Sequence, residues 1–311
     1  MVCNSSTFQT SKLTLDGTCS LIYNSLFILL SSVYGGALQC SSSGIVLRIY
    51  DSSFISCSAT SGGGGIYVKS SGAQFGIIRV CFDGCKTTST FGNAVFSDVY
   101  ATGTSYNNYS SMVYCVRGTP TSPCTYWHDN GICNLLSLNI SDCVSTHYCT
   151  VFIPRARVSV IECTFANSLT LNYVCHEYAI DSVSYSNKCN FVNLSHSHMS
   201  YSMVYFSGRE GEINDCTFYL NNPSKYLFGG SAGTNKVVNS YISHSSYLFL
   251  PGFSIPTSNI FVYSSSHSLK HLQAGSCQAD LPIPQSNIKT QYNSRTKSQM
   301  FLFSSVFMMH L

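Results

Sequence analysis

The chain has 311 residues, only 9% of them charged, and a formal net charge of +3 at pH 7. This balance gives no basic stripe, so nothing points to nucleic acid, and no run of about 18 or more apolar residues could supply a membrane span. The 16 Cys, 21 Tyr and 19 Phe residues, with many Ser and Gly residues, favour a β-rich protein.

Residues 1–19 are expected to form a partial N-terminal coil or cap. The first apolar stretch, SLFILLSSVYGGALQC at 25–40, is interrupted by Ser residues and preceded by Lys12 and Asp16, which does not fit a secretory signal. The stretch instead predicts a pair of strands around its two glycines. We therefore expect a fragment of a longer protein, or a chain whose start is misplaced.

A repeat begins in this stretch. Phe27, Phe54 and Phe82 are 27 and then 28 residues apart. The turn positions that follow them keep nearly the same step, at Gly36, Gly64 and Asn93. A fixed period in this range is typical of a solenoid. Alternate apolar positions predict half-buried strands within each period, and Gly, Ser and Asp residues predict the corners.

The period loosens between about 97 and 135 and then returns. The steps from Ile140 to Phe165, Phe191 and Phe218 are 25, 26 and 27 residues. We predict eight or nine coils between residues 20 and 264, with about three short strands in each coil.

The predicted architecture is all-β, a single-stranded parallel β-helix with an irregular C-terminal tail. Leucine-rich repeats have a similar period but need a Leu-x-x-Leu-x-Leu framework that this chain lacks, and propeller blades are longer. Each coil of a parallel β-helix stacks on the next at about 4.8 Å. A single coil is unstable because its few inward side chains do not offset the conformational entropy lost by its backbone.

Stacking would place equivalent residues of successive coils above one another. The predicted structural ladders are Phe54/Phe82, Phe165/Phe191/Phe218, Cys57/Cys85/Cys143 and Cys163/Cys189/Cys216. Cys is expected to act in them as a small buried apolar residue. A disulfide between rungs remains open, because about 4.8 Å lies within the Cα range of a disulfide. No Cys-x-x-Cys pair or His cluster accompanies the ladders, so we predict no metal site and no cofactor.

The segment 115–133, CVRGTPTSPCTYWHDNGIC, interrupts the period and is expected to be an inserted loop. It holds three Cys residues, for which a disulfide within the loop is a candidate, and the only Trp of the chain. Loops carry binding functions more often than stacked walls do. Trp127 and His128 are therefore the candidate contact residues, with a self-packed loop as the alternative.

Carbohydrate-active β-helices need clustered carboxylates, or carboxylates that bind calcium beside a basic residue. The acids of this chain are spread over the corners, where they are expected to cap turns. Glu210 and Glu212 are the only close acidic pair within the coils and are expected to form a charged corner. We therefore predict no catalytic residue.

Four sequons make Asn4, Asn108, Asn139 and Asn193 candidate glycosylation sites. Together with the high Cys content and the low charge, they favour an extracellular or cell-surface location. The alternative is an intracellular protein with buried, reduced thiols.

Two short motifs resemble the repeats of polymorphic outer membrane proteins. Gly35-Gly36-Ala37-Leu38 matches their GGA[ILV] tetrapeptide and Phe218-Tyr-Leu-Asn221 their FxxN tetrapeptide, with near variants at Gly64-Gly65-Ile66-Tyr67 and Phe54-Ile-Ser-Cys57. Such repeats occur in chlamydial autotransported adhesins, and similar cysteine-bearing repeat proteins occur on the surface of parasitic protists. The resemblance implies a right-handed β-helix, surface display and adhesion. The chain shows no autotransporter barrel, which argues against a bacterial outer-membrane origin.

Residues 265–311 are expected to form a polar, Pro-containing linker and a 12-residue apolar tail, MFLFSSVFMMHL, which is too short to span a membrane. Membrane attachment would thus need an anchor outside the chain. The leading hypothesis is a non-enzymatic surface-exposed or secreted protein that binds a host-surface protein or glycan. The alternatives are a carbohydrate-active enzyme and a scaffold whose binding face lies in missing flanks.

Overall fold

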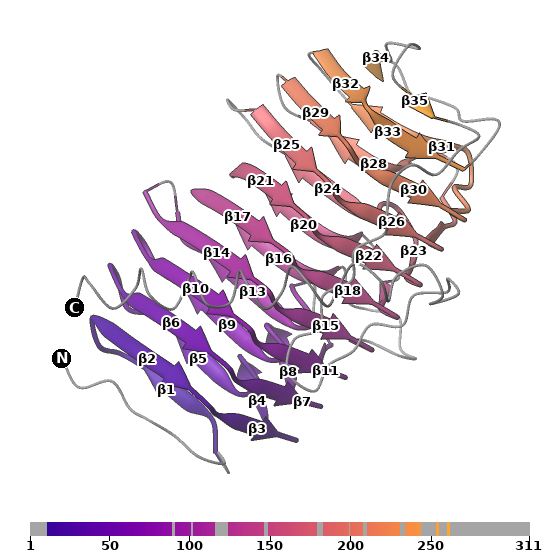
Figure 1. The fold of residues 1–311 in the computed structure, drawn as a ribbon. Helices are drawn as coiled ribbons and strands as arrows, with labels where there is room; N and C mark the ends of the chain where they lie inside the picture. Colours follow the sequence, from indigo (N-terminus) through magenta and orange to yellow (C-terminus); the bar gives the residue numbers. More distant parts are fainter. Residues whose placement is uncertain are drawn as a thin grey trace, which may run out of the picture.

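The computed structural model describes residues 11–88, 91–100, 102–115, 124–145, 149–178, 183–198, 200–207, 210–230, 234–243, 253–254 and 260–261. These residues form a stack of β-coils that runs from indigo to orange in Figure 1. Every strand pairing among them is parallel, and they contain no helix. The expected all-β parallel solenoid is therefore confirmed. None of these described residues forms a helix that could cross a membrane.

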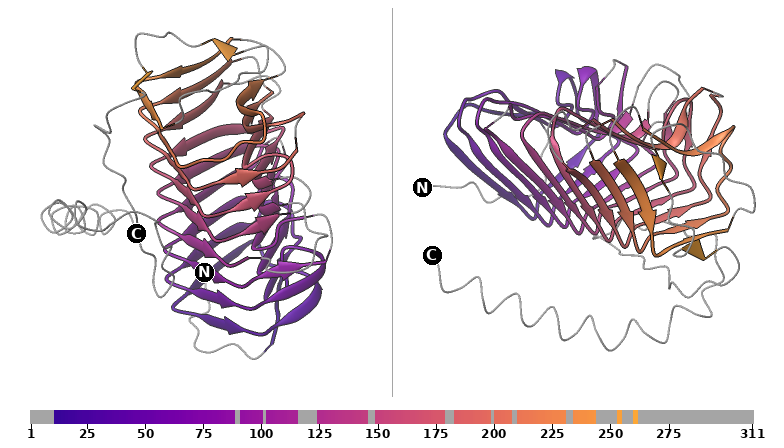
Figure 2. Two further views of the ribbon diagram at one scale, coloured as in Figure 1. Left: turned by 90° about the vertical axis from the view of Figure 1, so that its right-hand side faces the viewer. Right: turned by 90° about the horizontal axis from the view of Figure 1, so that it is seen from above.

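Three long sheets make the walls of the stack, one strand of each sheet per coil. The first sheet consists of β1 (Leu13–Leu15), β5 (Leu38–Cys40), β9 (Ile66–Lys69), β13 (Val95–Asp98), β16 (Cys124–Asp129), β20 (Cys149–Pro154), β24 (Cys175–Tyr178), β28 (Ser202–Phe206) and β31 (Tyr226–Gly230). The two views of Figure 2 show the strands of successive coils lying side by side along the stack.

The second and third sheets are built in the same way. The second consists of β2 (Cys19–Tyr23), β6 (Val46–Tyr50), β10 (Gln74–Ile78), β14 (Thr104–Asn108), β17 (Ile132–Leu136), β21 (Arg157–Ile161), β25 (Val183–Asn187), β29 (Glu210–Asn214), β32 (Thr234–Val238) and β34 (Phe253–Ser254). The third consists of β3 (Leu26–Ile28), β7 (Ser53–Ile55), β11 (Cys81–Asp83), β15 (Ser111–Val113), β18 (Asn139–Ser141), β22 (Thr164–Ala166), β26 (Asn190–Val192), β30 (Thr217–Tyr219), β33 (Ser240–Ile242) and β35 (Ile260–Phe261).

Two three-stranded sheets extend the coils beyond the third sheet. One consists of β4 (Ser31–Tyr34), β8 (Ser58–Gly62) and β12 (Lys86–Thr87), and the other of β19 (Val144–Ser145), β23 (Leu169–Thr170) and β27 (Ser195–His196). The right-handed winding implied by the sequence resemblance stays a prediction, in line with the strong preference of parallel crossovers for that hand.

An inner aromatic column runs through the third sheet. Phe54 pairs in register with Phe27 on one side and Phe82 on the other, and the ring centroids are 4.6 and 4.9 Å apart. In the second half of the stack, Phe191 lies 5.1 Å from Phe165 and 4.6 Å from Phe218. All of these rings are almost completely buried. The predicted Phe ladders therefore form the centre of the core.

The loosened part of the repeat continues the same column without aromatic residues. Met112 pairs with Phe82 and then with Ile140, and Ile140 pairs with Phe165. An aliphatic side chain fills the same buried position, so the column is unbroken although the sequence motif is lost.

The expected inserted loop at 115–133 is wrong for most of its length. Cys124–Asp129 forms β16 and Ile132–Leu136 forms β17, and both pair in register with the coils on either side. Residues 116–123 lie outside the described residues. Cys115 and Cys124 carry free thiols, so the candidate disulfide of this segment does not include them.

Left-handed corners bracket the strands of the third sheet. The corner before the strand is formed by Asn24, Asp51, Arg79, Tyr109, Ser137, Glu162, Lys188, Asp215 and Asn239. The corner after it is formed by Leu29, Ser56, Gly84, Tyr114, Asp142, Asn167, Asn193 and Leu220. This conformation costs roughly 1–2 kcal/mol for a residue other than glycine. The cost is offset because corner amides still donate to the neighbouring coil, as in the 3.1 Å bond from Asp51 N to Ile78 O.

The residue after a corner points inward and often carries a short hydrogen-bonding side chain. Ser52 Oγ donates to Tyr50 O at 2.6 Å and accepts from the Ser25 amide of the neighbouring coil at 3.1 Å. Cys216 repeats this pattern, because its Sγ donates to Asn214 O at 3.2 Å and accepts from the Cys189 amide at 3.3 Å. Ser and Cys are thus interchangeable corner residues, which explains much of the cysteine content.

The predicted cysteine columns are the two positions that follow these corners. Cys57, Cys85 and Cys143 come after the third-sheet strand and are joined in the same column by Cys115. Cys163, Cys189 and Cys216 come before it. All seven are buried and carry free thiols.

The two tetrapeptide motifs have direct roles in stacking. Gly35 has a φ of 57°, and a Cβ on Gly36 would lie 2.1 Å from Gly64 O and 2.5 Å from Ser58 O. Leu38 pairs with Ile66, so the matching tetrapeptide of the next coil begins at Gly63, one residue before the expected Gly64. The near variant is therefore Gly63-Gly64-Gly65-Ile66, one residue earlier than the sequence motif predicts.

The FxxN motif joins two coils through its Asn side chain. Phe218 stacks on Phe191 with an interplanar angle of 4°. Asn221 Oδ1 accepts from the Leu194 amide at 3.0 Å, and its Nδ2 donates to Phe191 O at 2.8 Å. Phe fills the core and Asn closes the following corner.

Replacement of Gly36 by Ala tests the close approach of two coils. Because the new Cβ would meet backbone atoms, Gly36→Ala should lower the free energy of unfolding by about 2 kcal/mol or more. Gly17→Ala is the matched control, since its nearest atom would be 3.9 Å away, and should change that free energy by less than about 0.5 kcal/mol. Urea unfolding followed by circular dichroism measures both, and equal midpoints would contradict the predicted contact.

Candidate functional site

The outer face of the first sheet carries a row of aromatic side chains, which we name the outer aromatic stripe. It consists of Tyr67, Phe96, Trp127, Phe152 and Tyr205. The first four pair in register on consecutive strands, and the backbone of His176 occupies the rung between Phe152 and Tyr205. Since side chains alternate along a strand, the stripe points away from the core.

Further aromatic residues widen the stripe on its flank. Tyr34 lies 4.8 Å from Tyr67 between ring centroids, and Phe91 packs edge-on against both Phe96 and Trp127. Farther along the stack, Tyr173 contacts Tyr201 and Tyr205, and these rings belong to one cluster with Trp127 and Phe152. The result is a continuous aromatic surface over several coils.

Ring orientation changes along the stripe. Tyr67 and Phe96 stack at 4.8 Å with an interplanar angle of 16°, so they cover each other's faces and are largely buried. Trp127 is tilted by 39° from Phe96, and Phe152 lies at 61° to Trp127. Trp127 is half-buried, and none of the rings that it contacts lies parallel to it. Trp127 Nε1 is buried and has no hydrogen-bond partner.

A charged row lies two residues farther along the same strands. It consists of Lys69, Asp98 and Asp129, which pair in register, and is joined by Arg155, which follows the end of β20 and binds both carboxylate oxygens of Asp129. Asp98 Oδ1 accepts from Asn130 Nδ2 at 3.0 Å. Burial raises the pKa of Asp129, and the Arg155 guanidinium opposes that shift. The row places exposed cationic groups beside the stripe.

The two candidate contact residues lie on opposite faces of the same strand. Trp127 lies at the centre of the outer aromatic stripe, on a strand and not on a loop. His128 is fully buried, because it is the next residue of β16 and points to the core. The expectation that His128 contacts a partner is therefore wrong.

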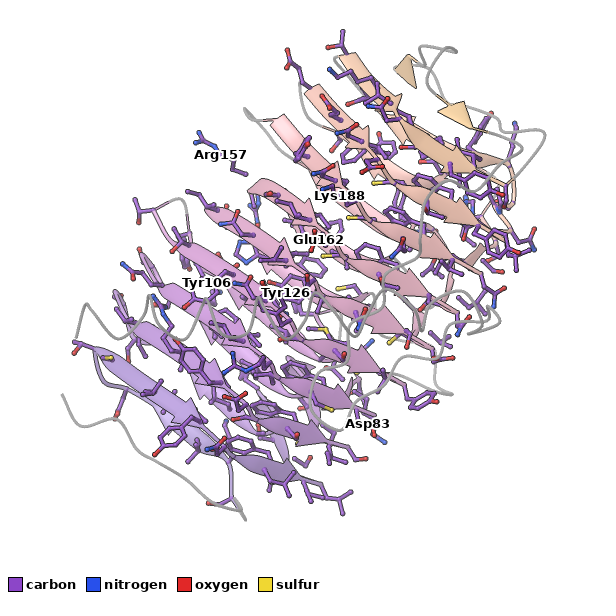
Figure 3. All side chains as sticks on the ribbon, viewed as in Figure 1. Asp83, Tyr106, Tyr126, Arg157, Glu162 and Lys188 are labelled. Atoms are coloured by element: carbon purple, nitrogen blue, oxygen red, sulfur yellow. The ribbon has the colours of Figure 1, made fainter. Side chains whose placement is uncertain are left out.

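His128 belongs to a buried polar cluster between the first and second sheets. Its Nδ1 lies 2.8 Å from Ser97 Oγ and 3.0 Å from Ser105 Oγ, while its Nε2 has no partner. Tyr126, labelled in Figure 3, points into the same region and its hydroxyl lies 3.8 Å from Cys133 Sγ. Burial lowers the pKa of His128 to about 4. The imidazole is therefore neutral at physiological pH.

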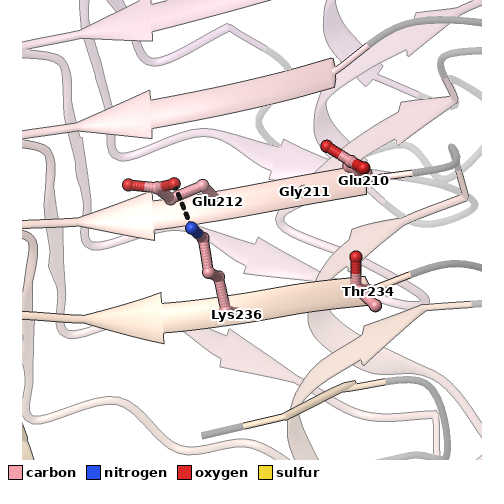
Figure 4. A pocket seen from close by; sticks show the side chains of 5 residues that line it. All are labelled: Glu210, Gly211, Glu212, Thr234 and Lys236. Carbon is pink, nitrogen blue, oxygen red and sulfur yellow. Dashed lines mark ion pairs between the residues drawn. The ribbon is translucent and has the colours of Figure 1, made fainter. Parts of the chain in front are cut away.

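A shallow hollow of about 270 Å³ lies on the outer face of the second sheet (Figure 4). It is lined by Glu210, Gly211, Glu212, Thr234 and Lys236, and Lys236 Nζ lies 2.9 Å from a Glu212 oxygen. Both glutamates belong to β29, so the acidic pair lies on a wall and the predicted charged corner is wrong. Because Lys236 already neutralises one glutamate, this hollow is a weaker candidate than the stripe.

The sequons differ in accessibility. Asn193 is exposed at a corner and its Nδ2 donates to Asn167 Oδ1 at 2.9 Å. Asn108 is half-buried at the end of β14. Asn139 is buried, so it cannot accept a glycan in the folded chain and this prediction is wrong. Asn4 lies outside the described residues.

Most of the stripe was missed because aromatic residues in strands normally indicate core positions. A signal was nevertheless present. Tyr67 and Phe96 each follow a left-handed glycine, Gly63 and Gly92, by four residues. This constant offset assigns them to one column, and alternation with Ile66 and Val95 assigns that column to the outer face.

Comparison with protein-family models, with curated proteins and with solved structures finds no match to this chain. The geometry of the stripe and of the charged row is therefore the basis for any functional proposal.

The buried His128 should make the stability depend on pH. The unfolded chain binds a proton on this histidine near pH 6.5, whereas the folded chain binds it only near pH 4. The free energy of unfolding should therefore fall as the pH decreases from 6.5 to 4, by about 3 kcal/mol for this group. His196, whose pKa is also lowered by burial, adds a change of the same sign.

His128→Gln isolates this contribution, because Gln keeps a hydrogen-bonding group and does not titrate. Urea unfolding of both proteins at pH 7 and pH 4.5 should show a smaller pH dependence for the variant. The same pH dependence in both proteins would contradict a buried neutral His128.

Proposed function

We propose that the protein is a non-enzymatic, surface-exposed or secreted β-helix that binds a glycan or protein on a host surface. The outer aromatic stripe is the observation that carries this proposal. Aromatic side chains offer large contact areas with little loss of conformational entropy, and they are enriched at binding surfaces. A rigid sheet holds them in a fixed row, which suits an extended ligand.

The charged row complements the stripe. Lys69 and Arg155 have exposed side chains beside the aromatic surface. Their N–H groups can donate to hydroxyl, carboxylate or carbonyl oxygens of a ligand that lies on the rings. Aromatic contact combined with polar donors at the rim is the usual composition of a recognition surface.

The resemblance to polymorphic outer membrane protein repeats adds support of a limited kind. Both tetrapeptides are used for coil stacking in this chain, so they support the fold more directly than the family. We base on that resemblance the further proposal that the protein is adhesin-like, lies on the cell surface and comes from a parasitic protist.

Binding should depend on the exposed rings of the aromatic surface. The double variant Tyr34→Ala/Phe91→Ala removes side chains that are 39% and 37% exposed and contact the stripe. Its affinity for glycans on an array, or for host cells, should fall at least about tenfold, the loss expected when two well-packed contacts are truncated. Trp127→Ala should weaken binding further.

Tyr23→Ala/Tyr109→Ala is the matched control, because these tyrosines are 39% and 40% exposed and lie on the second sheet and its corner. It should bind like the unmodified chain. Equal losses in both double variants would contradict binding through the stripe. Failure of the unmodified protein to bind any member of a broad panel would contradict the proposed function itself.

A carbohydrate-active enzyme is the second candidate, favoured by one arrangement. Asp98 and Asp129 pair in register beside the aromatic stripe, so their Cα atoms are about one rung apart, a separation that suits a carboxylate pair. Asp129, however, is buried and held by Arg155 through both oxygens. That engagement leaves it unavailable as a nucleophile or base, and the binding proposal is therefore preferred.

Incubation with pectin-like and alginate-like polymers distinguishes the two candidates. The binding proposal predicts no release of uronates or reducing ends. Release by the unmodified chain that is abolished in Asp98→Asn, while the fold and glycan binding persist, would establish the enzyme instead.

A further inference from the structure

The two cysteine columns place free thiols at equivalent positions of consecutive coils. The column after the third-sheet strand holds Cys57, Cys85, Cys115 and Cys143, and the column before it holds Cys163, Cys189 and Cys216. Neighbouring side chains within each column interact with one another. The sulfur atoms, yellow in Figure 3, recur from coil to coil.

Disulfides fit these columns poorly. Equivalent residues of parallel, in-register coils hold their side chains in the same direction, so neighbouring Cβ atoms are about 4.8 Å apart, like the backbones. A disulfide needs Cβ atoms within about 3.5–4.5 Å. The separation of Cα atoms, which is all that the sequence-based argument considered, is compatible with a disulfide. The expected separation of Cβ atoms is too long for one.

A two-coordinate metal ion fits the same spacing. Two metal–sulfur bonds of about 2.3 Å each, in line, span about 4.6 Å, close to one rung of about 4.8 Å. The described residues contain no group of three or more His, Cys, Asp or Glu side chains that could hold a metal, which excludes tetrahedral zinc there. The remaining candidates are soft metal ions that can be held by only two sulfur ligands. Thiolate ligands favour monovalent copper and chemically similar ions such as Ag(I).

We propose that neighbouring thiols of the cysteine columns bind a soft monovalent cation of the Cu(I) or Ag(I) type, held linearly between two coils. Each ion takes one sulfur from each of two consecutive coils, with the ion on the line that joins them. The sites lie inside the stack and are independent of the outer aromatic stripe.

Charge balance determines the protonation of such a site. All seven thiols are buried, and burial raises the pKa of Cys163 and Cys216, which favours their neutral form. A net charge in this core would be costly. Binding therefore releases one proton per ion, so that one thiolate and one neutral thiol share a monovalent cation. The thiolate gives up its hydrogen bond to the carbonyl that it faced.

Adjacency of thiols, not their number, is the property to test. Cys85→Ser/Cys115→Ser/Cys189→Ser leaves four column thiols, of which no two are neighbours within the same column. Ser is tolerated at these corners, since Ser52 and Ser168 occupy equivalent positions with similar hydrogen bonds.

The matched control also replaces three column cysteines. Cys57→Ser/Cys143→Ser/Cys163→Ser leaves four column thiols as well, but keeps two neighbouring pairs, Cys85–Cys115 and Cys189–Cys216. Circular dichroism spectra that match the unmodified chain establish that both variants are folded.

Reduced protein and both variants are incubated with excess Ag(I) in chloride-free buffer, and bound ions are counted by native mass spectrometry. The control should hold two silver ions more than the variant without neighbouring pairs, and the unmodified chain one more than the control. X-ray absorption should show two sulfur neighbours per ion. Equal silver counts in the two triple variants would overturn the proposal, since silver would then follow thiol number alone.

Discussion

Backbone hydrogen bonding between consecutive coils is the interaction on which the rest of the structure depends. Each coil donates to and accepts from its neighbours in parallel register, and this pairing continues through the left-handed corners, as at Asp51 and Ser56. The pairing imposes the same backbone on every coil. Residues as different as Arg79, Tyr109 and Glu162 therefore share one unfavourable conformation, because its loss in any coil would break the ladder on both sides.

This constraint also determines which parts of the fold could be predicted from the sequence. Phe54 and Phe82, or Phe191 and Phe218, were assigned to one column because a stacked position that holds the same large side chain repeats visibly. Met112 and Ile140 fill the same column but could not be found by motif, since the core needs volume there and not aromaticity. The sequence predicts a loop at 115–133 because the aromatic repeat is interrupted in this part of the chain.

The candidate functional residues were harder to predict than the core, because their role depends on which face of a strand they occupy. Trp127 was singled out for its rarity and does lie on the outer face, whereas His128, its neighbour, lies in the core because strand residues alternate. Seven thiols occupy corner positions that Ser fills elsewhere, and Asn139 is buried, so coil packing accounts for these cysteines and for this asparagine.

The stack thus carries an outer stripe of aromatic rings and inner columns of buried thiols. Both depend on the same register between coils. Nuclear Overhauser effects between Phe rings in a selectively ring-labelled chain measure that register most directly. Contacts between Phe54 and Phe82, and between Phe191 and Phe218, are predicted, because their ring centroids are 4.9 and 4.6 Å apart. The absence of both contacts in a folded protein would contradict the stacked coils and everything built on them.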